Sequence, residues 1–419
     1  MGRSNPPHFF LNTYPQSNKI TREEYKRMAK KKNAVVSDDF TSDLIQSLNK
    51  EHGSKVAYNL AYDISPTHVK RWISTGSKQL DYIISNRRDG GLPEGRIIEI
   101  FGPPSIGKSH LAIQIARSTQ HMGGIVVYID TENATSVENL SALGVDIEKR
   151  FVYVDTHCTE EVLSIAEATI MKAKAMDKDI PVTIVWDSVA ASSPKAELVG
   201  DYDKDSIGLQ ARAISKGMRK ITGVIGNQNV LFVILNQIRT KIGVMYGDPT
   251  ITPGGKAIPF HSSVRIKLGA GQKIENKDKE VIGIHVSAKT IKNKVSPPFR
   301  TIDFEIHFGK GIKEHEQIFD LLRKAGPGVV NGHDVNIRGT GAWKTIMVSN
   351  AETGEVINEK KFYKADFAEM MEDEFFGSYI DGLLELALVR VDASVDVESY
   401  EEVRTIAMEL EEGILDPEH

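Results

Sequence analysis

The 419-residue chain has almost no cysteine and no long apolar segment, and both absences restrict what it can be. Its single cysteine, Cys158, excludes an internal disulfide, and no Cys/His cluster has metal-ligand spacing. No apolar run approaches the ~18 residues that a membrane span requires, and the N-terminal stretch MGRSNPPHFFLN lacks the continuous apolar centre of a signal peptide. We therefore expect a cytoplasmic protein with no membrane partner.

Charge is nearly balanced over the whole chain, but it is unevenly distributed. The net charge of -5 neither requires nor excludes a nucleic-acid partner. The first 32 residues are rich in lysine and arginine, whereas the last 24 contain a single basic residue, Arg404, among many carboxylates. A basic arm and an acidic tail of this kind are as compatible with solvated chain ends as with contacts to a partner.

The pattern of apolar residues predicts an α/β protein. Short β-branched runs such as GIVVYID, VTIVWD and NVLFVILNQ alternate with helical stretches such as KSHLAIQIARSTQ, which is typical of βαβ units and a largely parallel sheet. Before this region, Leu44, Ile45 and Leu48 predict a helix with Thr41 or Ser42 as its N-cap and Gly53 as its end. After it, NAETGE reads as a turn between two strands of a smaller α+β segment. The expected divisions are 1–38, 39–75, 76–310, 311–390 and 391–419.

The segment GPPSIGKS, which begins at Gly102, has the G-x-x-x-x-G-K-S pattern of a phosphate-binding loop. It follows the apolar run RIIEIF and precedes a helical pattern, the setting in which this motif binds phosphate. Gly102 and Gly107 let the backbone turn so that N–H groups face the phosphates at a helix N-terminus. Lys108 supplies positive charge near the β and γ phosphates, and the Ser109 hydroxyl can hold Mg²⁺. The two prolines lack N–H groups, so residues 105–109 form most of the cradle.

Two apolar runs end in carboxylates. VTIVWD ends at Asp187, where a carboxylate beside the loop is suited to hold Mg²⁺ through water. VVYIDTE delivers Asp130 and Glu132 to the same predicted sheet edge. Glu132 is the better candidate to deprotonate the attacking water, because that base cannot also be consumed as a metal ligand.

A long segment from Asn236 to Phe260 is rich in glycine, proline and threonine. Its basic residues are suited to phosphates and its apolar residues to bases, although a flexible surface loop without a ligand would look similar. A second glycine-bounded loop leads into a helical stretch that carries Arg212, Lys216 and Lys220 four residues apart, with Arg219 beside them. This basic face strengthens the nucleic-acid interpretation, and a solvated face remains the alternative.

These segments resemble the bacterial RecA recombinase family. The motifs GGLPEGRIIEIFGPPSIGKS, YIDTENA, GLQARAISKGMRK, LNQIRTKIGVMYGDPTITPGGKAI and IKNKVSPPF occur in the order and at the spacing of that family, over roughly residues 40–325. The resemblance implies a RecA-like ATPase core, an N-terminal helical element that packs on the next subunit, and a small C-terminal α+β domain. It also implies two DNA-binding loops, at about 199–208 and 237–256, and the use of ATP and Mg²⁺.

The resemblance assigns roles position by position. The implied catalytic residues are Lys108, Glu132, Gln237, Lys292 and Lys294, the two last reaching across to the neighbouring subunit's ATP. The implied nucleotide contacts are Gly102, Ser105, Gly107, Lys108, Ser109, Asp187 and Pro298, of which Ser109 and Asp187 also hold the metal. The implied DNA contacts are Ile207, Arg212, Ser215, Arg219, Arg239, Lys241, Ile242, Gly254 and Gly255. Phe260, Lys292 and Lys294 would lie at the subunit interface.

The sequence departs from the family at several positions. Ser136 and Asn139 stand where an aspartate and a tyrosine usually hold adenine, and Pro259 replaces a lysine beside the interface phenylalanine. Pro104 and Ile106 replace commoner polar residues in the phosphate loop. After residue 325 the similarity to bacterial proteins weakens, and the chain resembles the recombinases of large phages, which suggests a virus-encoded relative.

Together these features predict a DNA-dependent ATPase that forms helical filaments on single-stranded DNA and catalyses homologous pairing and strand exchange in DNA repair. Its expected partners are single- and double-stranded DNA, further copies of itself, and single-strand-binding and mediator proteins. One alternative is a hexameric motor on the same core, which would form rings. Another is a non-hydrolysing DNA-coating protein, whose filament lifetime would ignore the substitution Glu132→Gln.

Overall fold

The structure, a computed structural model, describes residues 39–60, 63, 67–200, 208–240 and 250–390. The predicted basic arm and acidic tail lie outside these residues, as do the predicted DNA contacts Ile207, Lys241 and Ile242. The described chain belongs to two units, one before Val69 and one from Val69 onward. Within the described residues no helix has the length and apolar character needed to cross a membrane.

The first unit contributes helix α2 (Asp39–His52). The predicted helix is confirmed, but neither Thr41 nor Ser42 is its N-cap, because the helix already begins at Asp39 and both residues lie in its first turn. Gly53 ends it as expected, with φ of 63° and its N–H bonded to the Lys50 carbonyl. The Asn49 side chain then accepts the N–H groups of Val56 and Ala57, which turns the chain back beside the helix end.

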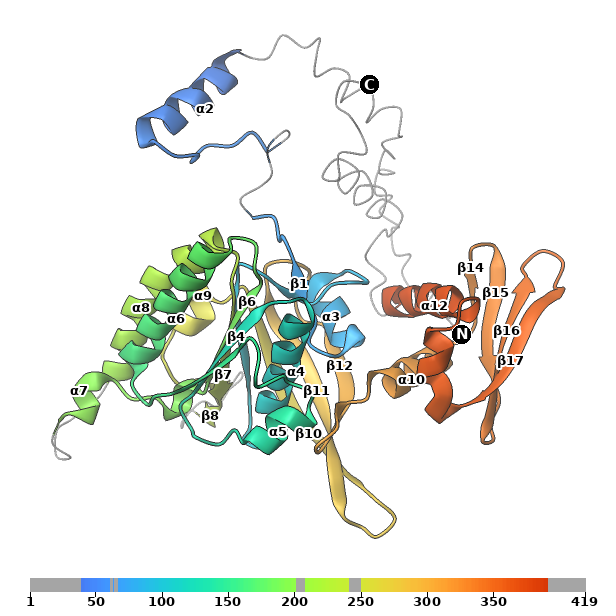
Figure 1. The fold of residues 1–419 in the computed structure, drawn as a ribbon. Helices are drawn as coiled ribbons and strands as arrows, with labels where there is room; N and C mark the ends of the chain where they lie inside the picture. Colours follow the sequence, from blue (N-terminus) through green and yellow to red (C-terminus); the bar gives the residue numbers. More distant parts are fainter. Residues whose placement is uncertain (1–38, 61–62, 64–66, 201–207, 241–249, 391–419) are drawn as a thin grey trace, which may run out of the picture. The chain divides into compact units, whose positions relative to one another are not determined.

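The second unit is built on a large sheet (Figure 1). Its described strands are β3 (Ile97–Gly102), β4 (Ile125–Asp130), β5 (Phe151–Asp155), β6 (Val182–Asp187), β7 (Leu231–Gln237), β10 (Val264–Glu275), β11 (Val281–Asn293), β12 (Thr301–His307) and β13 (Gly311–Ile312). Among the described residues these nine strands lie in the order β13-β12-β11-β10-β3-β7-β6-β4-β5. The strands from β10 to β5 are parallel, and β11, β12 and β13 extend the sheet in antiparallel fashion. The largely parallel sheet predicted from the sequence is therefore confirmed.

Helices cover both faces of this sheet. One face carries α3 (Lys78–Ser85), α4 (Lys108–His121) and α5 (Val137–Ala142). The other carries α6 (Thr159–Met176), α8 (Leu209–Asn227) and α9 (Ala257–His261). Short elements complete the unit: β1 (Trp72–Ile73), β2 (Leu92–Pro93), η2 (Val189–Ala191), α7 (Lys195–Leu198), β8 (Arg239–Thr240) and β9 (Thr250–Ile251). Because strands such as β3 and β6 are buried along their whole length, their sequences are mostly apolar.

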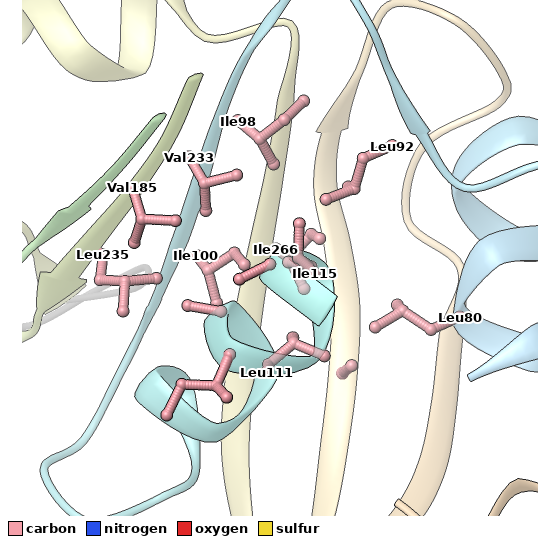
Figure 2. Packing of buried hydrophobic residues seen from close by; sticks show 14 of the residues in the cluster. Leu80, Leu92, Ile98, Ile100, Leu111, Ile115, Val185, Val233, Leu235 and Ile266 are labelled. Carbon is pink, nitrogen blue, oxygen red and sulfur yellow. The ribbon is translucent and has the colours of Figure 1, made fainter. Parts of the chain in front are cut away.

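Packing between α4 and the central strands fixes the loop that joins them. Leu111 and Ile115 of α4 face Ile98 and Ile100 of β3 in a fully buried cluster, which Figure 2 shows from close by. Burying side chains of this size contributes roughly 1.5–3 kcal/mol each. The segment between β3 and α4 is therefore held at both ends by a rigid core.

A smaller antiparallel sheet follows α10 (Glu314–Ala325). Its described strands are β14 (Gly328–Val330), β15 (His333–Arg338), β16 (Trp343–Asn350) and β17 (Val356–Tyr363), in that order. The chain then continues through η3 (Lys364–Asp366), α11 (Phe367–Met371) and α12 (Phe376–Arg390). The predicted turn at NAETGE is confirmed, since it connects β16 to β17. Apolar side chains of α10, α11 and α12 pack with one face of this sheet to form a separate core.

Candidate nucleotide and DNA-binding site

At two positions, the loop between β3 and α4 has room for no side chain larger than that of glycine. A Cβ on Gly102 would lie 2.5 Å from the Leu268 carbonyl oxygen, so β10 approaches too closely for any side chain there. Gly107 has φ of 90°, and a Cβ on it would lie 2.3 Å from the Ile306 Cδ1. Ile106 is buried in the core, which explains why an apolar residue stands in this loop. Ser105 is exposed and adopts φ of 58°.

Lys108, the first residue of α4, lies folded against the loop. Its Nζ donates to the carbonyl oxygens of Gly102 at 3.2 Å and Pro103 at 2.6 Å. Burial lowers the pKa of Lys108, and the nearby carboxylates Asp187 and Glu132 partly offset this. The acidic neighbours favour the charged ammonium, and its neutral carbonyl partners can be replaced by phosphate oxygens, which form stronger charge-assisted hydrogen bonds.

Two acidic strand ends lie side by side. Asp130 at the end of β4 pairs in register with Asp187 at the end of β6. Asp187 accepts a hydrogen bond from the buried Tyr128 hydroxyl at 2.6 Å. Burial raises the pKa of Asp187, while the hydrogen bonds from Tyr128 and Ser109 lower it. A carboxylate beside a serine hydroxyl is a hard-oxygen donor set that fits Mg²⁺.

Glu132 and Asp130 differ in what they contact. The Glu132 carboxylate accepts hydrogen bonds from the Ser188 hydroxyl and from Gln237 Nε2, the latter at 3.1 Å. Asp130 instead accepts two backbone N–H groups, those of Glu132 and Thr135, each at 2.9 Å. Asp130 therefore holds the turn, and Glu132 remains the carboxylate available for chemistry, in contact with Gln237.

A buried polar network, which the sequence reasoning missed, lies next to Gln237. Asn236 donates from Nδ2 to Glu99 Oε1 and to the Pro253 carbonyl, both at 3.0 Å. Glu99 in turn forms an ion pair with Arg265, and both Asn236 and Glu99 are fully buried. A charged or amide residue inside an apolar strand is a detectable sequence signal, because burying it requires specific partners. Tyr128 in VVYID and Ser188 after VTIVWD carried no comparable signal.

The described part of the predicted DNA contacts gathers at α8. Arg212, Ser215 and Arg219 lie on its outer side, where Ser215 accepts a hydrogen bond from Arg219 at 2.8 Å. Lys220 is not available in the same way, because it forms an ion pair with Glu167 of α6 at 2.6 Å.

Both glycines at the end of the second loop also belong to this group. Gly254 and Gly255 have φ of 88° and 71°, and Cβ atoms there would crowd Ile214 and Ala211 of α8 at 2.9 and 3.0 Å. The C-terminal end of the second loop therefore packs on the N-terminal half of α8. Arg239 is exposed in β8, at the start of the loop.

The predicted interface residues gather elsewhere. Lys292 Nζ donates to the carbonyl oxygens of Pro259 at 2.7 Å and Phe260 at 2.9 Å, and the Phe260 ring is 74% exposed. This use of the Pro259 carbonyl does not require the side chain that the family usually has at that position.

The strand register places this group away from the phosphate loop. Lys292 pairs with Arg265, which pairs with Glu99, and Lys294 bonds through its backbone to Ser263, which bonds to Ile97. They are thus level with the first half of β3, whereas the phosphate loop follows its end. The six residues of β3 span roughly 17 Å. The structure therefore does not bring Lys292 and Lys294 to the phosphate loop of the same chain.

The remaining predicted positions have local roles or open surroundings. Ser136 caps α5, since its hydroxyl accepts the Asn139 N–H at 3.1 Å. Pro298 lies exposed between β11 and β12.

A phosphate loop between a buried parallel strand and a helix, with a strand-end carboxylate beside its serine, defines a P-loop nucleotide-binding protein with a RecA-like core. Comparison with known proteins agrees: the RecA N-terminal domain matches residues 41–313. The chain is 39% identical over 322 residues to Protein RecA of Chlorobaculum tepidum, covering 77% of this chain and 87% of the relative. It is 40% identical over 334 residues to Protein RecA of Trichodesmium erythraeum, covering 79% and 85%. The chain therefore belongs to the RecA family of recombinases.

Proposed function

We propose that this protein is a cytoplasmic DNA-dependent ATPase that assembles head to tail on single-stranded DNA and catalyses homologous pairing and strand exchange with double-stranded DNA. Single-strand-binding and mediator proteins are its proposed further partners. One observation carries the proposal: Lys292, Lys294 and Phe260 lie beside the first half of β3, whereas the phosphate loop follows its end.

The proposed nucleotide is ATP with Mg²⁺, which supplies charge neutralisation at the phosphates when bound. Gly102, Ser105 and Gly107 shape the loop, and Lys108 exchanges its two carbonyl partners for phosphate oxygens. Ser109 and Asp187 hold the metal, with Tyr128 keeping Asp187 in place. Glu132 acts as the general base, for which its exposed position suits access to water.

Adjacent residues of β7 link the nucleotide to DNA in this proposal. Gln237 contacts Glu132, and Asn236 holds Pro253 near the end of the second loop. A change at the γ-phosphate that moves Gln237 therefore acts on the loop and on the neighbouring α8 surface. Arg212, Ser215, Arg219, Arg239, Gly254 and Gly255 are the described residues proposed to contact DNA.

The separation of the two groups supports a site that is shared between neighbouring copies. Lys292 and Lys294 of one copy would complete the site of the next, where their charges stabilise the transferred phosphoryl group. The same two surfaces repeated along a chain give a heterologous contact, which generates an open helix unless the rotation closes.

The decisive experiment mixes two inactive variants. Lys108→Ala lacks the loop lysine but keeps Lys292 and Lys294. Lys292→Ala keeps the loop lysine but lacks one of the two lysines proposed to reach the neighbouring site. Each alone should show little ATP hydrolysis with single-stranded DNA, whereas an equal mixture should regain activity, because about one quarter of interfaces combine both intact halves. No recovery in co-assembled filaments would argue against a shared site.

Imaging and a DNA-free control extend this test. Hydrolysis by the wild type should rise strongly with single-stranded DNA, and the same samples should contain extended filaments. Closed rings, or hydrolysis indifferent to DNA, would favour the hexameric motor.

A further inference from the structure

The small sheet has one face that its own helices do not cover. Ile346 and Val348 of β16 point into the core formed with α10, α11 and α12. Because side chains alternate along a strand, Trp343, Thr345 and Met347 lie on the opposite face. Figure 1 shows α10 and α12 on one side of the sheet only.

An aromatic pair stands at one end of this open face. Trp343 and Tyr363 are directly opposite each other on β16 and β17, with ring centroids 3.9 Å apart and planes inclined by 32°. The two residues are nevertheless 53% and 42% exposed. A stacked pair of this kind keeps an outer aromatic face on each side, on which a further planar group can stack.

Basic side chains form the next row. Arg338, Thr345 and Lys361 are consecutive cross-strand partners on β15, β16 and β17, two residues along from the aromatic pair and on the same face. Arg338 and Lys361 are exposed, and no ion pair with another described residue involves either one. The acidic residues of this face, Glu359 and Asp334, lie in rows farther from the rings. Positive charge is thus concentrated beside the aromatic pair.

We propose that the aromatic pair and the adjacent basic row together form an additional binding site for single-stranded DNA. An unpaired base stacks on Trp343 or Tyr363, and the adjoining phosphates face Arg338 and Lys361. Rows on one face of a sheet are about 7 Å apart, so a long basic side chain reaches the phosphate of a base held over the rings. Stacking on aromatics combined with basic residues is how sheets bind single strands without sequence preference. The site deepens the proposed function and rests on it, since it gives the same DNA a contact outside α8 and the two loops.

Tryptophan emission of the full chain provides a direct test. Of the three tryptophans, Trp186 is fully buried and Trp72 is partly covered by Arg87, so Trp343 is the exposed fluorophore. We expect oligo-dT to quench the emission, and an abasic oligomer of equal length and charge to do so far less. In Trp343→Phe the quenching should disappear while the affinity for oligo-dT stays within about twofold, because phenylalanine still stacks.

Affinity measurements on a second pair of variants complete the test. The double variant Trp343→Ala/Tyr363→Ala should bind oligo-dT about tenfold more weakly or worse, whereas Val329→Ala, at an exposed position on the same sheet, should match the wild type. Equal quenching by the abasic oligomer, or unchanged affinity of the double variant, would overturn the proposal and point to a protein partner for this face. DNA-stimulated ATP hydrolysis in the same samples separates the two proposals. Its absence from the wild type would contradict the proposed function. Its presence, together with an unchanged affinity of the double variant for oligo-dT, would contradict only the additional site.

Discussion

The two sheets of the second unit differ in how many of their faces are covered. The central strands of the large sheet lie between two layers of helices, and β3 and β6 are buried at every position. The small sheet is covered on one face, and β15 alternates between buried and exposed residues. The central strands of the large sheet can therefore present functional groups only at their ends, whereas the small sheet leaves a whole face available for binding.

Tryptophan substitutions give the largest contrast between the sheets. Trp186→Ala in β6 should lower the free energy of unfolding by about 3–5 kcal/mol, because it leaves a cavity in a fully buried layer. Trp343→Ala in β16 should lower it by less than about 1 kcal/mol, since the ring is half exposed. Urea denaturation of both variants measures the difference. Equal losses would mean that the face carrying Trp343 is buried in solution.

Asp81 is a buried carboxylate in α3, the helix that contributes side chains to both cores. Leu80 of α3 packs in the large-sheet core and Tyr82 in the small-sheet core, and Asp81 lies between them in sequence. Burial raises the pKa of Asp81 to about 7, against the hydrogen bonds from Ser74 and Thr75. The folded state then holds a proton that the unfolded state releases near pH 4, so this group lowers stability as the pH rises from 4 to 7, by up to about 4 kcal/mol.

The variant Asp81→Asn isolates this effect. It cannot ionise, so the wild type should lose stability relative to the variant as the pH rises from 4 to 7, and the difference should level off above pH 7. Denaturation of both proteins across that range measures it. A difference that stays constant with pH would contradict the raised pKa.

Removing the Tyr128 hydroxyl should have the smallest effect, and this effect should be confined to the strand ends of the large sheet. Tyr128→Phe keeps the buried ring but removes the hydrogen bond to Asp187. We expect the Mg²⁺ concentration needed for half-maximal ATP hydrolysis to rise severalfold, up to about tenfold, as for the loss of a hydrogen bond to a charged group. Thermal stabilisation by ATP with Mg²⁺ should fall in parallel, while stabilisation by ATP with EDTA should not change. Equal losses with and without the metal would assign Tyr128 a purely structural role.

The sequence predicts the large sheet better than it predicts the site's internal contacts. Runs such as IIEIFG and VTIVWD identify strands, because burial on both faces leaves mostly apolar residues, and the loop motif fixes which strand precedes the phosphates. The contact between Gln237 and Glu132 depends on the spatial neighbours β7, β6 and β4, which no local pattern specifies. The start of α2 differs from the predicted one for another reason: Thr and Ser are acceptable within a first turn as well as at a cap.

The separation of Lys292 from the phosphate loop also bears on how many complete sites an assembly of several copies would contain. If the proposed shared site is correct, a row of n copies joined head to tail would contain n − 1 complete sites, so a lone copy would have none and activity per subunit would rise with length. One terminal copy would offer an unused phosphate loop, and the other would offer unused lysines and an uncovered Phe260. The two ends would therefore differ chemically, and such an assembly would have a direction before it meets any DNA.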